Sequence, residues 1–397
     1  MTRRRVWLWV FAAVLVAGSA AAAEPVVRVG VLSLLKPGSL ELRPLDPGRM
    51  VLEPKGEAYP VGPDGFCRLD RLDGHLALRI DPSGAGARAK KLRWIPAAAG
   101  GRWEVRLPAG FRRIFAGPAC FTPERAGPWI RAVVDRPLES YVAGVVQAEQ
   151  ARLDSPPALA ALAVLARGNA VAWRGRHRRD GFDLCDNTHC MLYLGEEAVA
   201  DPVRAAVRES AGKILTVGGH PSPHPFTACC GGHLFPSGWL WPDGSIEGLR
   251  ECPWCRESPD FRWRYQAPRE IFLDEVARAL DLRAVQAVSI VMDPKRGPRV
   301  TVTAAGKRSD WPVEQFRIRY GRLYGWNRIR SNNFNLERQG GQFVLEGKGF
   351  GHCAGLCLAG AIQLGLGGRS VEEILRFYFP ESRVANLASI NSSKPSW

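Results

Sequence analysis

The sequence predicts an α+β protein in which a small β-rich domain precedes a larger domain of mixed short strands and helices that form a cleft. Residues 24–125 contain segments of alternating apolar and polar side chains, such as 26–32 (VVRVGVL) and 76–80 (LALRI), separated by turns rich in Gly and Pro. From residue 126 the pattern changes to a strand followed by long apolar, Ala-rich stretches. We therefore place an accessory β-rich domain at 24–125, a second domain at 126–385 and a tail at 386–397.

Each element of the second domain follows from a local pattern. The β-branched run at 129–134 predicts a strand, and the apolar segments after it predict helices over 137–148 and 156–173. Pro156 and Pro157 suit the first turn of a helix, and Ser155 or Asp154 can cap it. Further along, the pattern predicts helices over 268–281, 357–365 and 370–378, and strands over 288–292 and 300–303.

The first 23 residues are predicted to be a secretory signal peptide. Three arginines, Arg3 to Arg5, precede an apolar run over 6–18, and small residues at 21–23 form a cleavage site. The apolar run is shorter than the ~20 residues that span a bilayer, which disfavours the alternative of an uncleaved anchor. We expect an exported protein of the periplasm, cell wall or extracellular space, with no integral membrane span after cleavage.

The chain is strongly basic. Its formal net charge is +15, and removal of the three signal-peptide arginines leaves +12. Such a charge suits a polyanionic surface, although basic surface loops that serve solubility alone are the simpler explanation. Export, together with the lack of an Arg-rich helix with interleaved aromatic residues, argues against nucleic acid as a partner.

Ten cysteines in an exported chain make disulfides the default expectation. One group of them also has the spacing of a metal site. Cys185, His189 and Cys190 lie within six residues (CDNTHC), and a single turn can bring three such ligands onto one Zn²⁺. A fourth ligand is not assignable from the pattern; His177, Cys229, Cys230 or water can serve. A disulfide from Cys185 or Cys190 is the competing interpretation, because one thiol cannot serve both.

One carboxyl group stands out as a candidate catalyst. Glu149 follows the apolar stretch 141–146 (YVAGVV) and precedes the Pro-led helix that starts at 156. A carboxyl sheltered by apolar neighbours has a raised pKa and can act as a general acid near neutral pH. An ordinary glutamate at a helix end is the alternative.

Five separated motifs together resemble the SpoIID/LytB family of bacterial cell-wall proteins. In order along the chain they are 137–149 (PLESYVAGVVQAE), 157–167 (PALAALAVLAR), 182–193 (FDLCDNTHCMLY), 226–233 (FTACCGGH) and 347–361 (GKGFGHCAGLCLAGA). The resemblance covers roughly residues 126–385 and implies a SpoIID-like catalytic domain. This sequence departs from the family pattern at Leu162, Gly168 and Leu358, where the family usually has Gln, Thr and Gln.

The resemblance implies a peptidoglycan lytic transglycosylase that acts on glycan strands. Glu149 matches the catalytic glutamate, which cleaves the β-1,4 bond between N-acetylmuramic acid and N-acetylglucosamine and leaves a 1,6-anhydro end. Arg167, His352 and the Gly231-Gly232 turn match positions that are expected to hold glycan or tune the acid. Each also has a structural alternative: a buried bridge for Arg167 and an ordinary turn residue for His352. Some family members bind zinc at a comparable Cys/His site.

Two other functions remain open from the sequence. The LytB side of the family implies a non-catalytic wall-binding protein or amidase enhancer, with a cell-wall amidase as its partner. A secreted zinc hydrolase centred on His189 and Cys190 is the second alternative, although no HExxH-like base accompanies these ligands. Cys252 and Cys255 (CPWC) lack a thioredoxin-like context, so we expect a local disulfide or a metal clip there. Family membership alone does not establish a role in sporulation.

Overall fold

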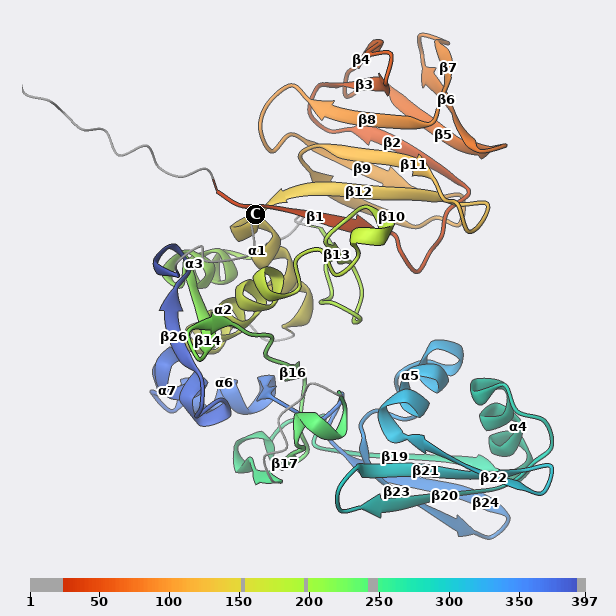
Figure 1. The fold of residues 1–397 in the computed structure, drawn as a ribbon, viewed down its shortest axis with the longest axis vertical. Coiled ribbons are helices and arrows are strands. Elements are labelled where there is room, and N and C mark those ends of the chain that lie inside the picture. Colours follow the sequence, from red (N-terminus) through yellow and green to blue (C-terminus); the bar gives the residue numbers. More distant parts are fainter. Residues whose placement is uncertain (1–23, 151–153, 196–198, 242–248, 391–397) are drawn as a thin grey trace, which may run out of the picture.

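A computed structural model describes residues 24–150, 154–195, 199–241 and 249–390 (Figure 1). The predicted signal peptide and the end of the predicted tail, residues 391–397, lie outside the described residues. Within the described ranges, no helix is both long and apolar enough to cross a membrane. A long run of strands comes first, and helices and short strands then alternate, which confirms the predicted α+β class.

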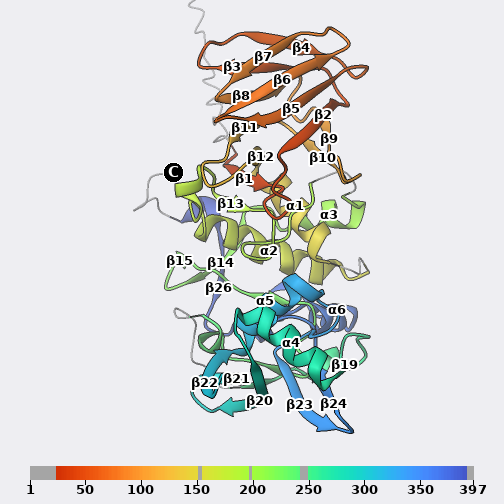
Figure 2. The same ribbon diagram turned by 90° about the vertical axis from the view of Figure 1, so that its right-hand side faces the viewer.

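The N-terminal part of the chain forms two mainly antiparallel sheets that share one hydrophobic core (Figures 1 and 2). Burial alternates along their strands, as the sequence pattern predicts, and Trp94 and Trp103 are among the largest fully buried side chains. The seven-stranded sheet has the order β13 (Leu184–Cys185), β1 (Val26–Val31), β12 (Ile130–Pro137), β11 (Ala119–Pro123), β8 (Lys91–Pro96), β3 (Gly48–Glu53) and β4 (Ala58–Val61). The six-stranded sheet has the order β10 (Arg112–Ala116), β9 (Arg102–Arg106), β2 (Ser39–Pro44), β5 (Phe66–Leu72), β6 (His75–Asp81) and β7 (Gly86–Ala89).

Strand β12 connects the two parts of the chain. It pairs antiparallel with both β1 and β11, so the sheet continues past the predicted boundary at residue 125. On the other side of β1, the short strand β13 pairs in parallel, with Gly30 opposite Cys185. This pairing places the Cys185 loop at one edge of the sheet.

A group of helices follows the sheets. It consists of α1 (Leu138–Glu149), α2 (Pro156–Ala172), α3 (Asp201–Glu209), α6 (Leu358–Leu366) and α7 (Val371–Tyr378). Helix α2 packs against the other four and is buried along most of its length, because Ala, Leu and Val occupy nearly every position. Ser155 takes the N-cap position of α2, with Pro156 in the first turn, but its side chain makes no capping hydrogen bond.

Short strands and 3₁₀ turns link the helices. The strands form three small sheets, β15 (His220–Pro221) with β14 (Lys213–Val217) and β26 (Arg383–Asn386), β16 (Phe226–Thr227) with β25 (Leu356–Cys357), and β17 (His233–Leu234) with β18 (Arg250–Glu251). The 3₁₀ turns are η1 (Arg178–Asp180), η2 (Ser237–Trp239), η3 (Pro253–Cys255) and η4 (Leu387–Ser389).

Residues 262–348 form a unit with a second hydrophobic core, away from the N-terminal sheets in both ribbon views (Figures 1 and 2). Its core includes Phe272, Phe316 and Tyr320 from two helices. The unit comprises β19 (Arg262–Pro268), α4 (Arg269–Leu280), β20 (Val285–Asp293), β21 (Gly297–Ala304), β22 (Lys307–Pro312), α5 (Val313–Tyr324), β23 (Asn333–Gln339) and β24 (Gln342–Lys348). The sequence patterns predicted α4 and parts of β20 and β21, but not the other elements of the unit or its separate core.

Candidate active site and metal centre

Glu149 is the last residue of α1, and its side chain is partly buried. The backbone N–H of Leu192 donates a hydrogen bond to its Oε1 over 2.8 Å. Burial raises the pKa of the Glu149 carboxyl to about 7, although the hydrogen bond from Leu192 acts in the opposite direction. A carboxyl with this pKa can both donate and accept a proton near neutral pH.

Aromatic packing fixes the loop that carries Leu192 against α1. The ring of Tyr193 lies 5.2 Å from that of Tyr141 and 6.5 Å from that of Phe115. Gly144 on α1 makes room for this loop, because a Cβ there would lie 2.5 Å from the Tyr193 ring. The glycine of the Gly-Val-Val motif therefore permits the contact between α1 and the loop that meets Glu149.

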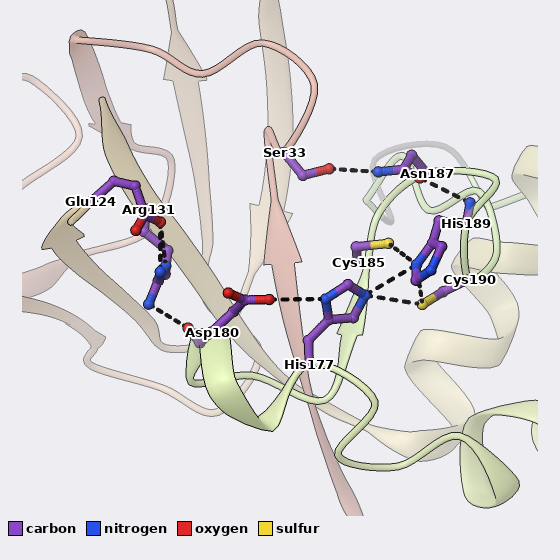
Figure 3. Close-up of polar contacts among 9 residues, drawn as sticks. All are labelled: Ser33, Glu124, Arg131, His177, Asp180, Cys185, Asn187, His189 and Cys190. Atoms are coloured by element: carbon purple, nitrogen blue, oxygen red, sulfur yellow. Dashed lines mark hydrogen bonds and ion pairs between the residues drawn. The ribbon is translucent and has the colours of Figure 1, made fainter. Parts of the chain in front are cut away.

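Two histidines and two cysteines converge at the edge of the β13 strand (Figure 3). The ligand atoms of His177, Cys185, His189 and Cys190 all lie within 4.8 Å of one another. Cys190 Sγ is 3.6 Å from His177 Nε2 and 3.7 Å from His189 Nδ1, and Cys185 Sγ is 3.7 Å from His189 Nδ1. The two histidine nitrogens are 3.2 Å apart.

These spacings fit a tetrahedral Zn²⁺ site. Zinc–sulfur bonds of about 2.3 Å and zinc–nitrogen bonds of about 2.0–2.1 Å place neighbouring sulfur and nitrogen atoms about 3.6 Å apart and two nitrogens about 3.3 Å apart. The sequence named Cys185, His189 and Cys190, and the structure adds His177 from the alternatives for the fourth position. The donor set therefore suits one zinc ion with four protein ligands.

A carboxylate supports the histidine that completes the group. His177 Nδ1, the nitrogen that faces away from the cluster, lies 3.2 Å from Oδ2 of Asp180 (Figure 3). Metal-bound histidines commonly share their second nitrogen with a carboxylate, which fixes the ring orientation and the tautomer. The Phe182 ring stacks on the face of the His177 ring, with the two ring centres 4.8 Å apart, and restricts its position.

A cavity of about 490 Å³ lies beside this group, between β1, β12 and the 177–189 loop. Its lining includes His177, Cys185 and His189, but Glu149 is not among the described residues that line it. On its wall, Glu124 pairs with Arg131 at 2.6 Å, and Arg131 also donates to the backbone carbonyl of Asp180 (Figure 3).

Arg167 lies in the core of the helical part. Its side chain is fully buried, and its Nε and Nη2 donate to the two carboxylate oxygens of Glu139 over 2.7 and 2.6 Å. Its Nη1 donates to the carbonyl of Lys213 over 2.9 Å. This arrangement ties α2 to α1 and to β14, as the structural alternative for Arg167 implies.

The Gly231-Gly232 turn packs against the protein itself. Both glycines have positive φ, and a Cβ on Gly231 would lie 2.4 Å from the carbonyl carbon of Lys348. The carbonyl of Gly232 accepts a hydrogen bond from the N–H of Cys252 over 2.9 Å. The turn thus joins β16 to the chain that leaves the 262–348 unit and to the segment before η3.

His352 lies in the Gly-rich turn after β24 and is held in its neutral form. Its Nδ1 accepts a hydrogen bond from the N–H of Ala354 over 3.1 Å, and its ring meets Trp241 edge-on at 5.1 Å. Burial lowers the pKa of His352 to about 4, against the attraction of Glu314. His352 is therefore uncharged at neutral pH.

Apart from Arg167, the predicted site residues fall into two groups. Glu149 and the Cys/His cluster are joined by one loop, since Leu192 follows Cys190 by two residues. The Gly231-Gly232 turn and His352 belong to a second group, in which an isolated bridge pairs Cys229 with Phe350. No sequence signal indicates the Leu192 N–H, because almost any residue can donate from its backbone.

The comparisons with known proteins find similarity to one family. Residues 128–217, which include α1, α2 and the Cys/His cluster, match the family model described as "SpoIID: Stage II sporulation protein". Stage II sporulation protein D of Bacillus amyloliquefaciens is 28% identical over 268 residues, which are 62% of this chain and 74% of that protein. The Bacillus subtilis (strain 168) protein of the same name is 24% identical over 274 residues, covering 64% of this chain and 76% of that protein.

An uncharacterised protein of Brachyspira hyodysenteriae is 25% identical over 265 residues, 64% of this chain and 68% of its own length. The fold is thus that of an α+β protein with a SpoIID domain. These similarities support the assignment to the SpoIID family that the sequence motifs predicted.

Proposed function

We propose that this protein is an exported, cell-wall-related protein that cleaves peptidoglycan glycan strands as a lytic transglycosylase. Glu149 is its general acid and base. The observation that carries the proposal is the partly buried Glu149 carboxyl, whose pKa is raised to about 7 and whose Oε1 is held by the N–H of Leu192. The basic chain, with 54 Lys and Arg against 39 Asp and Glu, supports attraction to an anionic wall.

In the proposed reaction one carboxyl does two tasks. Protonated Glu149 donates its proton to the oxygen that leaves with N-acetylglucosamine as the β-1,4 bond breaks. The resulting carboxylate then takes the proton of the C6 hydroxyl of N-acetylmuramic acid, and that oxygen bonds to the anomeric carbon. This closes the 1,6-anhydro ring without water and restores protonated Glu149, so a second catalytic carboxylate, as in hydrolases, is not needed.

We propose a structural zinc ion held by His177, Cys185, His189 and Cys190. When bound, zinc would cross-link the 177–190 loop to the edge of the N-terminal sheet. The loop residues after Cys190 then position Leu192 N–H on Glu149 and Tyr193 on Tyr141. The site supports the activity through the placement of these groups.

The closed ligand set weighs against the zinc hydrolase. A catalytic zinc site keeps one position for water or substrate, whereas four protein ligands fill this group. One observation supports the other alternative, which is a non-catalytic wall-binding protein or amidase enhancer with a cell-wall amidase as its partner. The described cavity is lined by His177 and His189 rather than by Glu149.

The test is product analysis on purified peptidoglycan from which amidases have been stripped. We expect the wild-type protein to release anhydromuropeptides detectable by mass spectrometry, and Glu149→Gln to release none while it still pellets with the wall. Glu209→Gln, on the exposed end of α3, is the matched control and should behave as wild type. Undiminished release by Glu149→Gln rejects the role of this residue, and wall binding without anhydro products from the wild type favours the enhancer.

A further inference from the structure

Four cysteines from three separate segments meet in the interior, at a distance from the Cys/His cluster in the sequence. Cys230 follows β16, Cys252 precedes η3 and Cys255 ends it, and Cys357 ends β25 and is the N-cap of α6. Their four Sγ atoms lie within 4.8 Å of one another, and all four residues are fully buried. We propose that these four thiolates bind one structural Zn²⁺ ion, in a site independent of the Cys/His cluster.

The distances suit one metal ion better than disulfides. Cys230 Sγ is 3.6 Å from Cys255 Sγ, while the edge of a tetrahedron with zinc–sulfur bonds of about 2.3 Å is about 3.8 Å long. A disulfide requires about 2.05 Å, and all ten cysteines of the chain are free thiols. The predicted disulfides, including one within the CPWC segment, thus find no support. An iron–sulfur cluster would hold its thiolates farther apart, because several metal ions and sulfides lie between them.

The surroundings supply donors for negatively charged sulfur. The N–H groups of Cys230 and Gly360 point at Cys357 Sγ over 3.3 and 3.4 Å. The hydroxyl of Tyr378 lies 3.5 Å from Cys252 Sγ, where it can donate. Cys357 also sits at the N-terminus of α6, whose dipole favours negative charge. Such outer contacts orient metal ligands and stabilise the thiolate form.

Gly360 shows how closely this site is packed. A Cβ at this position would lie 2.3 Å from the Tyr378 hydroxyl and 3.1 Å from Cys252 Sγ. Glycine therefore lets the first turn of α6 approach both the thiolate group and its hydroxyl donor. With four buried protein ligands the site has no open position, which assigns it a structural role.

A fifth thiol provides a natural control. Cys229 contacts the thiols of Cys255 and Cys357, but it is not among the four whose Sγ atoms all lie within 4.8 Å. It is buried to the same extent as Cys230 and precedes it directly in the chain. The proposal therefore separates two adjacent cysteines: Cys230 is a ligand and Cys229 is not.

The site stands at the base of the 262–348 unit. Cys255 lies seven residues before β19, where the chain enters the unit, and Cys357 lies nine residues after β24, where the chain leaves it. A metal ion bound here cross-links the segment that enters the 262–348 unit to the segment that leaves it. The Gly-rich turn with His352 lies between Lys348 and Cys357, so the same ion limits where His352 can lie.

The experiment measures zinc per chain by native mass spectrometry and elemental analysis on the exported full-length protein. We expect two zinc ions in wild type and in Cys229→Ser. We expect one in the pair Cys252→Ser/Cys255→Ser, which removes this site. We also expect one in the pair Cys185→Ser/Cys190→Ser, which removes the Cys/His cluster. In cobalt-substituted protein, Cys185→Ser/Cys190→Ser keeps a site with four thiolates, whereas Cys252→Ser/Cys255→Ser keeps a site with two. The sulfur-to-cobalt absorption per ion should therefore be about twice as strong in the first variant as in the second.

X-ray absorption at the zinc edge keeps the test decisive if Cys252→Ser/Cys255→Ser does not fold. In the Cys185→Ser/Cys190→Ser protein the remaining zinc should have four sulfur neighbours at about 2.3 Å. No zinc in that protein overturns the proposal. A mass increase of intact wild type on reduction, traced to these cysteines, overturns it in favour of disulfides, and iron in the site overturns the choice of metal.

Discussion

The backbone N–H of Leu192 lies 2.8 Å from Oε1 of Glu149, two residues after Cys190 of the Cys/His cluster. This hydrogen bond connects the end of α1 to a loop whose other end is held by two thiols and two imidazoles. The hydrogen bond favours the ionised carboxylate, while burial favours the protonated form. Burial has the larger effect, so the pKa of Glu149 is raised to about 7. The ionisation of Glu149 therefore depends on how firmly the loop is held.

The pH dependence of the proposed reaction follows from this pKa. The free enzyme needs protonated Glu149 to start the reaction, so kcat/KM should be constant below pH 6 and fall about tenfold per pH unit well above pH 7. Initial rates of anhydromuropeptide release from pH 5 to pH 9 measure the profile. A rate that rises through pH 7 to 9 would contradict the role of Glu149 as the initial acid.

The stability of Glu149→Gln should depend on pH in a defined direction. Because the folded-state pKa exceeds the usual value of 4.5, the folded state binds more protons than the unfolded state between pH 4.5 and 7. Wild-type stability is therefore lost as pH rises through this window. Glutamine keeps the acceptor for Leu192 without the charge, so the variant should be more stable than wild type by about 1–3 kcal/mol at pH 8.

Urea unfolding at pH 4 and pH 8 checks this expectation. The difference between the two proteins should approach zero at pH 4, where the carboxyl is protonated in both the folded and the unfolded state. A variant less stable than wild type at pH 8 would show that the carboxylate is stabilised in place. Glu209→Gln, on the exposed end of α3, should show little pH-dependent difference.

The Asp180 carboxylate should tune zinc affinity at the Cys/His cluster. Asp180→Asn keeps the side-chain shape beside His177 Nδ1 but removes the charge, so zinc affinity should fall by about 10- to 100-fold. Asp183→Asn is the control on the same loop, because Asp183 accepts from the N–H of Arg28 and an amide oxygen can replace it. Competition with a zinc chelator measures both, and equal affinities would show that Asp180 does not support the site.

The local parts of this architecture could be predicted from the sequence, and the long-range parts could not. Prolines and apolar runs placed α1 and α2 within a residue or two, because helix signals are local. Cys185, His189 and Cys190 could be grouped because they share one short loop. His177 could not be chosen over its alternatives, because only the fold of the loop around η1 brings it to the other three.

The same distinction explains the other residues. Arg167 was named for the site, but its partner Glu139 is 28 residues away on another helix, and nothing in either motif indicates the pairing. Cys230 and Cys357 are separated by 127 residues and meet only through the parallel pairing of β16 with β25. The separate core of the 262–348 unit likewise depends on which apolar faces meet, and periodicity does not specify that choice.

The Arg167–Glu139 pair should be a determinant of stability. Arg167→Met removes the buried guanidinium partner of the partly exposed Glu139 carboxylate and the donor to the Lys213 carbonyl, so we expect a loss of about 1–3 kcal/mol. Adding Glu139→Gln should cost much less in this background than in wild type, because the carboxylate has already lost its partner. A loss below 1 kcal/mol together with a raised KM would instead support substrate contact by Arg167.

Gly360→Ala separates packing from helix propensity in the first turn of α6. Alanine is favoured over glycine inside a helix by about 1 kcal/mol, so propensity alone predicts stabilisation. The added Cβ would lie 2.3 Å from the Tyr378 hydroxyl, and overpacking of a buried site costs about 1–3 kcal/mol. We expect net destabilisation, measured by chemical denaturation.

Gly62→Ala is the control. Its Cβ would meet nothing within 4 Å, so it should change stability by less than about 0.5 kcal/mol. A stabilised Gly360→Ala protein would mean that Tyr378 and Cys252 move aside freely, contrary to the close packing around these thiols.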